Sequence, residues 1–233
     1  MVCVSRFIKG QWNAVGMSPA KMQVIHNFPP SRVQIGKPKL PELPAGALVV
    51  TFLGQVAEHK GILILLEAMA RLVAGGRNLV LWVAGDQTWD NGFFEKVNRC
   101  VTSLTLQDRV TFFGYVTNVV PVLERTDLHI CPSLFPDPLP NVVVEAKQCG
   151  KPSVVFPNGG LPELVEHKVD GYICRDSSVD ALVEGISYYL DRPDERRRAG
   201  EAARNSLEEK YGLERFRKQW AEVFLQTAAK KHE

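Results

Sequence analysis

The densest group of chemically capable residues lies in the stretch 132–146, where three alternating prolines surround Asp137. Each proline ring fixes one backbone angle, so such a loop is stiff. Glu145 follows Asp137 by eight residues. A short carboxylate in a stiff loop can contact a sugar, and Glu145 can accept hydrogen bonds from a pair of vicinal hydroxyls.

Backbone amides add to this group. Residues 141–149 are predicted to form a helix, with Pro140 suited to its first turn and Leu139 in the loop before it. The amides of Asn141 and Val142 then have no intrahelical acceptor and can donate to phosphate or sugar oxygens.

Two other interpretations of the carboxylates remain. Asp137 can cap the turn while Glu145 offsets the helix dipole. The two can also be a glycosidase pair, which is disfavoured because glycosidases usually draw their carboxylates from different elements.

Two glycine-bounded segments have related potential. Residues 54–61 begin with Gly54-Gln55, end with Lys60-Gly61, and lie between a predicted strand and a predicted helix. Glycine lets a ligand approach the backbone, a helix N-terminus favours an anion, and Lys60 can bind a phosphate. The alternative for Lys60 is a surface lysine at a helix start. The segment 159–163 offers a second glycine pair.

Several common sites are excluded. The chain has no G-x-G-x-x-G after its first long strand, no G-x-x-x-x-G-K-[ST] and no G-x-S-x-G. Its five histidines show no ligand spacing and are expected to be structural or on the surface. Five cysteines without a C-x-x-C pair indicate neither a disulfide framework nor a zinc site.

Apolar strands alternate with amphipathic helices from residue 48 onward. The strands are expected at 48–53, 78–84, 109–113, 128–131, 152–156 and 172–174, and the helices at 60–73, 93–104, 119–124, 141–149 and 181–190. This order predicts an α/β fold, a doubly wound and mostly parallel Rossmann-like sheet covered on both faces. Ligands of such folds bind beyond the carboxyl ends of the strands, where the loops 54–61, 85–92, 114–118, 132–141 and 157–161 are expected.

The chain divides into four parts. Residues 1–28 hold a helix at 5–15 and a strand at 22–26, too little for a core. A proline-rich linker follows at 29–47, the Rossmann-like domain at 48–210, and a C-terminal helix at 211–233. That helix has an apolar stripe that is expected to dock on a protein surface.

Composition narrows the class. Of 233 residues, 45% are hydrophobic and 23% charged, as in globular proteins. A formal charge of +2 does not favour nucleic-acid binding. The start resembles no signal peptide and no apolar run is long enough to span a membrane, so a cytoplasmic location is expected. The basic run at 196–198 is interpreted as a solvated helix face, with peripheral contact to a membrane surface as the alternative.

The motifs together resemble the nucleotide-sugar-binding domain of retaining glycosyltransferases of family 4, which have the GT-B fold. The family pattern P-S, E-x7-E, A and G-x-P is similar to Pro132-Ser133, Asp137, Glu145-Ala146 and Gly150-Lys151-Pro152. Its G-R-x4-K-G loop is similar to residues 54–61, its Gly-Gly-x-x-Glu motif to Gly159, Gly160 and Glu163, and its base-contacting loop to residues 113–116. The similarity begins near Val4 and reaches the last helix.

This resemblance implies a role for each matching residue. Glu145 would bind the ribose hydroxyls, and Lys60 the diphosphate. The amides of Asn141 and Val142 would hold phosphate and sugar. Asp137 would face the transferred sugar. The base would be bordered by Gly114, Tyr115 and Val116, and the other nucleotide-sugar contacts would be Gly54, Gln55, Leu139 and Pro140.

The implied reaction moves a sugar, with retention, from a UDP- or GDP-sugar to an acceptor hydroxyl, as in polysaccharide or glycoconjugate synthesis. The resemblance implies no metal or other cofactor, and the sequence has no D-x-D pair. Catalytic roles would fall to Asp137 and Lys60.

Three departures from the family pattern bear on activity. The first family acid is an aspartate here, one methylene shorter. The family arginine is Gln55, which cannot give phosphate a charged fork. An N-terminal acceptor domain precedes this region in the family. Only its last helix and strand are recognised here, so a partner domain or subunit and an unidentified acceptor are expected. A non-catalytic nucleotide or nucleotide-sugar binding module remains the alternative, and an unrelated doubly wound binding protein is disfavoured.

Overall fold

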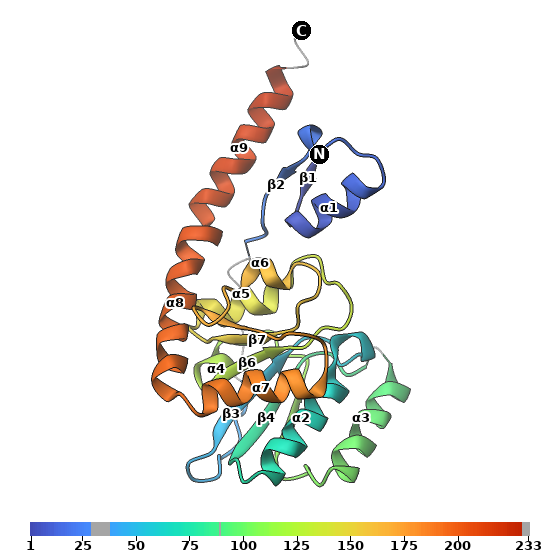
Figure 1. Ribbon diagram of the computed structural model, residues 1–233, viewed down its shortest axis with the longest axis vertical. Helices are drawn as coiled ribbons and strands as arrows, with labels where there is room; N and C mark the ends of the chain where they lie inside the picture. Colours follow the sequence, from blue (N-terminus) through green and yellow to red (C-terminus); the bar gives the residue numbers. More distant parts are fainter. Residues whose placement is uncertain (29–37, 89, 230–233) are drawn as a thin grey trace.

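The computed structural model describes residues 1–28, 38–88 and 90–229, so part of the predicted linker lies outside the described residues. The main body is a six-stranded sheet in the order β5-β4-β3-β6-β7-β8 (Figure 1). All its pairings are parallel, which confirms the predicted α/β fold. The strands are β3 (Leu48–Leu53), β4 (Leu79–Ala84), β5 (Val110–Gly114), β6 (Leu128–Cys131), β7 (Ser153–Val155) and β8 (Gly171–Ile173).

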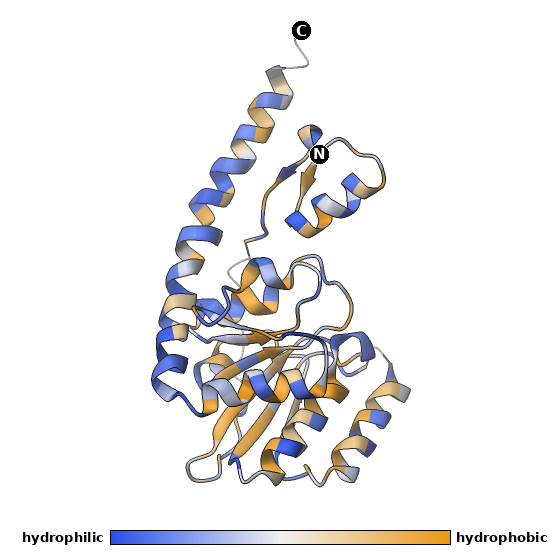
Figure 2. Ribbon diagram, in the orientation of Figure 1, coloured by the Kyte–Doolittle hydropathy of each residue, from blue (hydrophilic) through white to orange (hydrophobic). Residues whose placement is uncertain are grey.

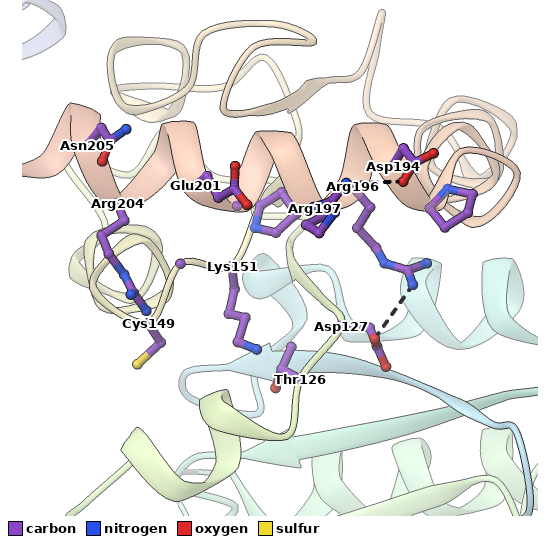
Figure 3. Close-up of a pocket in the computed structure, with 14 residues that line it drawn as sticks. Thr126, Asp127, Cys149, Lys151, Asp194, Arg196, Arg197, Glu201, Arg204 and Asn205 are labelled. Carbon is purple, nitrogen blue, oxygen red and sulfur yellow. Dashed lines mark hydrogen bonds and ion pairs between the residues drawn. The ribbon is translucent and has the colours of Figure 1, made fainter.

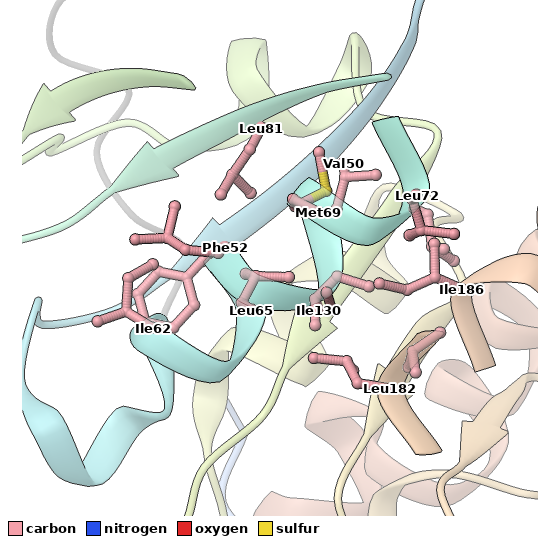
Figure 4. Packing of buried hydrophobic residues seen from close by; sticks show 14 of the residues in the cluster. Val50, Phe52, Ile62, Leu65, Met69, Leu72, Leu81, Ile130, Leu182 and Ile186 are labelled. Carbon is pink, nitrogen blue, oxygen red and sulfur yellow. The ribbon is translucent and has the colours of Figure 1, made fainter. Parts of the chain in front are cut away.

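Helices cover both faces of this sheet because its strands are apolar on both sides. Side chains of β3 alternate: Val50 and Phe52 join the large core cluster on one face, while Val49 and Leu53 join clusters on the other. The first face packs against α2 (Ile62–Ala74), α3 (Asn91–Ser103) and α7 (Val179–Leu190) (Figure 4). In Figure 2 the strands form a hydrophobic centre between helices with mixed surfaces.

The second face is covered by two helices, with two more beside them. α4 (Val120–Glu124) and α5 (Asn141–Gln148) pack on the sheet. α6 (Leu161–Leu164) and α8 (Pro193–Tyr211) contribute to the same cluster as α5. No helix among the described residues combines the length and apolar character that crossing a membrane requires.

A small N-terminal unit lies beyond the sheet, beside the helix that ends the chain (Figure 1). It consists of β1 (Val2–Cys3), α1 (Arg6–Ala14), a 3-10 turn (Pro19–Lys21) and β2 (Gln23–Val24), with β1 and β2 paired in parallel. Ser5 caps α1 by accepting from the Ile8 amide.

The apolar stripe of the C-terminal helix α9 (Leu213–Ala229) is expected to dock on a protein surface, and the described residues of this chain cover only part of it. Phe216 contacts Trp220 edge-to-face along the helix, and Trp220 contacts Phe224 with tilted rings. Phe224 is 65% exposed and Leu213 is 37% exposed. Within the described part of the chain, this stripe is therefore only partly covered.

The basic run at the start of α8 only partly forms the predicted solvated face. Arg197 and Arg198 are exposed and pair with Asp194 and Glu195 on their own helix. Arg196 instead turns inward, where its guanidinium donates to the Tyr189 carbonyl and lies 3.7 Å from Asp127. The interpretation is wrong for Arg196 because an acidic turn before β6 lies within its reach.

His129 in β6 illustrates the structural role expected for the histidines. It is fully buried, and its Nδ1 lies 2.9 Å from the Ser153 hydroxyl. Burial lowers the pKa of this imidazole from 6.5 to about 3, because the charged form would lose its hydration.

This burial makes stability depend on pH. Below pH 6.5 the unfolded chain protonates His129, whereas the folded chain does so only near pH 3, so the free energy of unfolding falls as pH decreases across this interval. At pH 5 we expect this contribution to reduce stability by about 2 kcal/mol. Urea denaturation at pH 7 and pH 5 measures it. The control His129→Gln does not titrate and should show a smaller loss; an unchanged loss would contradict the assignment.

Candidate functional site

Two of the predicted strand-end loops, 54–61 and 132–141, converge on a cavity of about 240 Å³ at the carboxyl ends of β3 and β6. Its lining includes seven of the residues proposed from sequence: Gly54, Lys60, Asp137, Leu139, Pro140, Asn141 and Val142. The loop after β3 supplies the first two, and the loop after β6 together with the start of α5 supplies the others. The structure thus brings together two segments that are about 80 residues apart in the sequence.

An ion pair joins the two residues predicted to be catalytic. Lys60 Nζ lies 2.7 Å from Asp137 Oδ2, and the two side chains are 27% and 17% exposed. The pair is therefore partly shielded from water but open to a ligand entering the cavity. A phosphate oxygen reaching the ammonium would exchange with the carboxylate or share the lysine with it.

A close backbone approach at Gly61 positions Lys60. Its φ is +76°, and a Cβ there would lie 1.9 Å from the Pro132 carbonyl oxygen, so a side chain would collide with the loop after β6. Glu58–Lys60 form a 3-10 turn before Gly61, and α2 begins only at Ile62. The helix predicted from residue 60 starts two residues later for this reason, which leaves Lys60 on the turn that faces the cavity.

Backbone hydrogen bonds fix the loop that holds Asp137. The His59 carbonyl accepts from the amides of Leu134 and Phe135 at 2.9 and 3.2 Å. The Asp137 carbonyl accepts from the Gly160 amide at 2.8 Å. Of the glycine pair at 159–160, the Gly160 amide therefore supports the Asp137 loop and is not available to an anion or a sugar.

The N-terminus of α5 also faces this cavity. Pro140 is the N-cap and provides no side-chain cap, so the first-turn amides of Asn141 and Val142 remain suited to an external acceptor. Glu145 is 6% exposed and lies one turn further along α5. The structure thus places Glu145 within the helix rather than on the described lining of the 240 Å³ cavity.

A row of glycines extends from this cavity towards the predicted base contacts. The Gly54 amide donates to the Ala84 carbonyl, and the Gly85 amide donates to the Gly114 carbonyl. A Cβ on Gly85 would lie 1.7 Å from the Gly54 carbonyl oxygen, so no side chain fits between these strand ends. Gly85 begins the predicted strand-end loop 85–92, was not among the individual residues proposed from the sequence, and is outside the described lining of the 240 Å³ cavity.

Tyr115 and Val116 lie at the far end of this row. Both line a second cavity of about 590 Å³, together with Lys39 and Leu40. Tyr115 is 74% exposed. Gln55 follows Gly54 and is half-buried, but it is outside the described lining of both cavities.

The thiol of Cys131 lines the smaller cavity but is not suited to act as a nucleophile. Burial raises its pKa to about 12, although Lys60 acts in the opposite direction. The thiol therefore remains protonated at neutral pH.

Glu163 connects α6 to the N-terminal unit. Its carboxylate accepts from the Arg6 and Phe7 amides at 2.8 and 2.7 Å and lies 3.2 Å from His26 Nε2. It therefore satisfies two first-turn amides of α1 and adds a negative charge where the helix dipole favours one.

Replacing Glu163 with glutamine should weaken this connection. Glutamine offers only one acceptor oxygen and no charge, so we expect a loss of about 1 kcal/mol in the free energy of unfolding. Faster hydrogen exchange at the Arg6 and Phe7 amides should accompany that loss. The control Glu166→Gln removes an exposed partner of Lys210; equal effects in both variants would contradict the capping role.

A buried lysine was not predicted from the sequence. Lys147 in α5 is 1% exposed, and its Nζ lies 2.6 Å from Asp170 Oδ2 and 3.0 Å from the Ser206 hydroxyl. Burial lowers the pKa of this lysine, while Asp170 opposes the shift. Asp170 also accepts from the Glu166 amide. This ammonium therefore joins α5 to α8 and to the turn before β8.

Comparison with known proteins supports the assignment of the fold and family. Residues 37–206 match the family described as Glycosyl transferases group 1. Spore coat protein SA of Bacillus subtilis is 28% identical over 184 residues, which cover 77% of this chain and 49% of that protein. This chain therefore spans about half the length of that relative.

Two solved structures are similar over nearly all of the chain. A glycosyltransferase from Rickettsia africae has a TM-score of 0.86 at 21% identity, covering 97% of this chain and 62% of that one. Anabaena HepE in complex with UDP-glucose has a TM-score of 0.83 at 23% identity, covering 97% and 63%. These likenesses establish the GT-B type of parallel α/β architecture. Because the family match covers well over half of the sequence, the chain belongs to the group 1 glycosyl transferases.

Proposed function

We propose that this chain forms the donor-binding part of a retaining glycosyltransferase of family 4 that uses a UDP- or GDP-sugar. The observation that carries the proposal is the Lys60–Asp137 pair beside the N-terminus of α5, in a cavity at the carboxyl ends of the strands. An ammonium and two helix N-terminal amides suit a diphosphate.

The spacing of the site fits a nucleoside diphosphate. Gly54 and Gly114 terminate β3 and β5, which are two strands apart in the sheet. Two strand spacings amount to about 10 Å. A diphosphate at Lys60 and Asn141 would therefore leave its base near Tyr115, with the ribose crossing the side-chain-free strip at Gly85. The UDP-glucose bound by HepE supports this class of ligand.

The residues have distinct roles in the proposed reaction. The bond between the anomeric carbon and the diphosphate oxygen breaks, and the diphosphate leaves with the electron pair. Lys60 and the amides of Asn141 and Val142 stabilise the growing negative charge. Asp137 faces the sugar, and Glu145 binds the ribose hydroxyls. The acceptor hydroxyl passes its proton to the departing diphosphate, and its oxygen bonds to the anomeric carbon on the face that the diphosphate leaves.

Calorimetry with UDP, GDP and ADP tests donor binding directly. We expect one of these nucleotides to bind the folded chain, with an affinity unchanged by EDTA because the proposed contacts include no metal. Absence of binding by all three would contradict the proposal. A nucleotide affinity that depends on a divalent cation would contradict the proposal that the donor binds without a metal.

Replacing Gln55 with arginine should strengthen nucleotide binding. A guanidinium after Gly54 would add a charge-assisted contact to phosphate worth about 1.5–3 kcal/mol, or at least about a tenfold decrease in the dissociation constant. Gln55→Lys adds the charge without the planar fork and should gain less. No gain with either variant would show that the diphosphate does not reach this position.

A second candidate function is a non-catalytic nucleotide-sugar binding module. Gln55 favours it, since the resemblance places an arginine there. Incubating the sugar conjugate of the bound nucleotide with and without an N-terminal acceptor domain distinguishes the two functions. Transfer or donor hydrolysis indicates the enzyme, and binding without turnover in both samples indicates the module.

The acceptor side is proposed to come from an N-terminal domain or a partner subunit. In both solved structures the protein extends beyond the region that aligns with this chain. The N-terminal unit and α9 lie on one side of the main body (Figure 1), and we propose that the acceptor domain packs on this side.

A further inference from the structure

A further cavity lies away from the candidate donor site. It has a volume of about 840 Å³ and lies between α8 and the turns that precede β6 and β7 (Figure 3). Thr126 and Asp127 come directly before β6, and Lys151 and Pro152 come before β7. Because the donor site is at the carboxyl ends, the length of β6, about 13 Å, separates the two.

Four cations line this cleft, and two of them have acidic partners. Arg196 lies 3.7 Å from Asp127, and Arg197 lies 3.3 Å from Asp194 (Figure 3). Lys151 donates to the Glu124 carbonyl at 3.1 Å. Neither Lys151 nor Arg204 has an ion-pair partner among the residues that the structure describes.

The Arg204 guanidinium lies against the loop that carries Lys151, and its charge acts on the Lys151 ammonium. A Cβ on Gly150 would lie 3.2 Å from an Arg204 guanidinium nitrogen, so the absence of a side chain there leaves room for Arg204 against the loop that carries Lys151. Figure 3 shows Arg204 extending from α8 beside Cys149, with Lys151 on the same side of the helix. The two like charges repel each other. An anion bound by both would relieve this repulsion.

The ionisation of Lys151 reflects the same arrangement. Burial is the main cause of its lowered pKa, and Arg204 lowers it further, while Asp127, Cys149 and Glu124 oppose the shift. An anion between the two cations would therefore raise the pKa of Lys151.

The rest of the lining suits hydroxyl groups. Glu201 and Asn205 are one turn apart on α8 and face the cleft. A carboxylate accepts hydrogen bonds from hydroxyls, and an amide both donates and accepts. The volume is within the usual range for small-molecule sites.

We propose that this cleft is a second ligand site, which binds a small phosphorylated polyhydroxy compound. Lys151 and Arg204 hold the phosphate, and Glu201 and Asn205 bind the hydroxyls. The site is independent of the donor cavity and of the proposed transfer reaction.

Calorimetry tests this site with glycerol 3-phosphate, inorganic phosphate and glycerol, in the presence of a saturating concentration of the nucleotide that the donor cavity binds. We expect glycerol 3-phosphate to bind, inorganic phosphate to bind more weakly, and glycerol not to bind. Lys151→Met and Arg204→Gln should each raise the dissociation constant of glycerol 3-phosphate at least about tenfold. Glu201→Gln should weaken the binding of glycerol 3-phosphate without weakening the binding of inorganic phosphate.

Two control variants make the result specific. Arg198→Gln removes an exposed arginine of the same helix that pairs with Glu195, and Lys60→Met alters the donor cavity; both should bind glycerol 3-phosphate normally. Absence of binding by folded wild-type protein would overturn the proposal. Loss of binding in Lys60→Met but not in Lys151→Met would place the ligand in the donor cavity and also overturn it. Equal affinities for inorganic phosphate and glycerol 3-phosphate would overturn the proposal that the cleft binds the hydroxyl groups of its ligand.

Discussion

Replacing Lys60 with methionine should raise the dissociation constant for the bound nucleoside diphosphate by about 10- to 100-fold. Methionine keeps the apolar stem and removes the charge, which costs a charge-assisted hydrogen bond of about 1.5–3 kcal/mol. It also leaves Asp137 without its partner at 2.7 Å, and that carboxylate then repels the diphosphate. If the chain hydrolyses or transfers its donor sugar, turnover should fall a further 100-fold or so, because the leaving diphosphate gains charge in the transition state.

Calorimetry and donor hydrolysis measure these two effects. The matched control is Lys96→Met. Lys96 is an exposed lysine of α3 that pairs with Glu58, and Glu58 belongs to the 3-10 turn that carries Lys60. The double variant Lys60→Met/Asp137→Asn separates lost attraction from new repulsion, and it should bind the nucleotide better than Lys60→Met alone. An unchanged nucleotide affinity in Lys60→Met would show that Lys60 does not contact the diphosphate.

Replacing Lys147 with methionine should lower the free energy of unfolding by about 3–5 kcal/mol. Asp170 is 3% exposed and would lose its cationic partner while remaining buried. Ser206 would lose a hydrogen bond as well. Urea denaturation at pH 7 measures the loss.

Two further variants identify the cause of that loss. Lys147→Met/Asp170→Asn removes both charges and keeps an acceptor for the Glu166 amide, so it should recover most of the lost stability. Lys210→Met breaks an exposed pair with Glu166 and should cost less than about 1 kcal/mol. A double variant as unstable as Lys147→Met would show that packing, and not an unpaired charge, causes the loss.

Local patterns predicted the sheet well. The strand at 48–53 and the strand at 128–131 have the predicted bounds, because short apolar runs between polar turns define both ends. The helix expected from residue 60 begins at Ile62, since the left-handed Gly61 interrupts it. β1 was not predicted, because Val2–Cys3 is a two-residue strand that depends on pairing with Gln23–Val24.

Long-range contacts were harder to predict. Strand order brings the loops of Lys60 and Asp137 together, and the parallel α/β pattern was enough to expect this. The burial of Lys147 could not be expected, because a lysine near the end of a helix is usually solvated. Its partner Asp170 comes from a turn whose position depends on the packing of α8. The capping of α1 by Glu163 likewise joins segments more than 150 residues apart.

The ion pair between Lys60 and Asp137 has a consequence for which anions the cavity can hold. The Asp137 carboxylate is tethered beside the Lys60 ammonium and competes with incoming anions for it. The effective concentration of this intramolecular competitor is of millimolar order or higher. A chloride ion or a simple carboxylate offers Lys60 no more than Asp137 already does. A ligand with several oxygens can engage the ammonium and the α5 amides at once, so the pair screens incoming anions by the number of contacts they make.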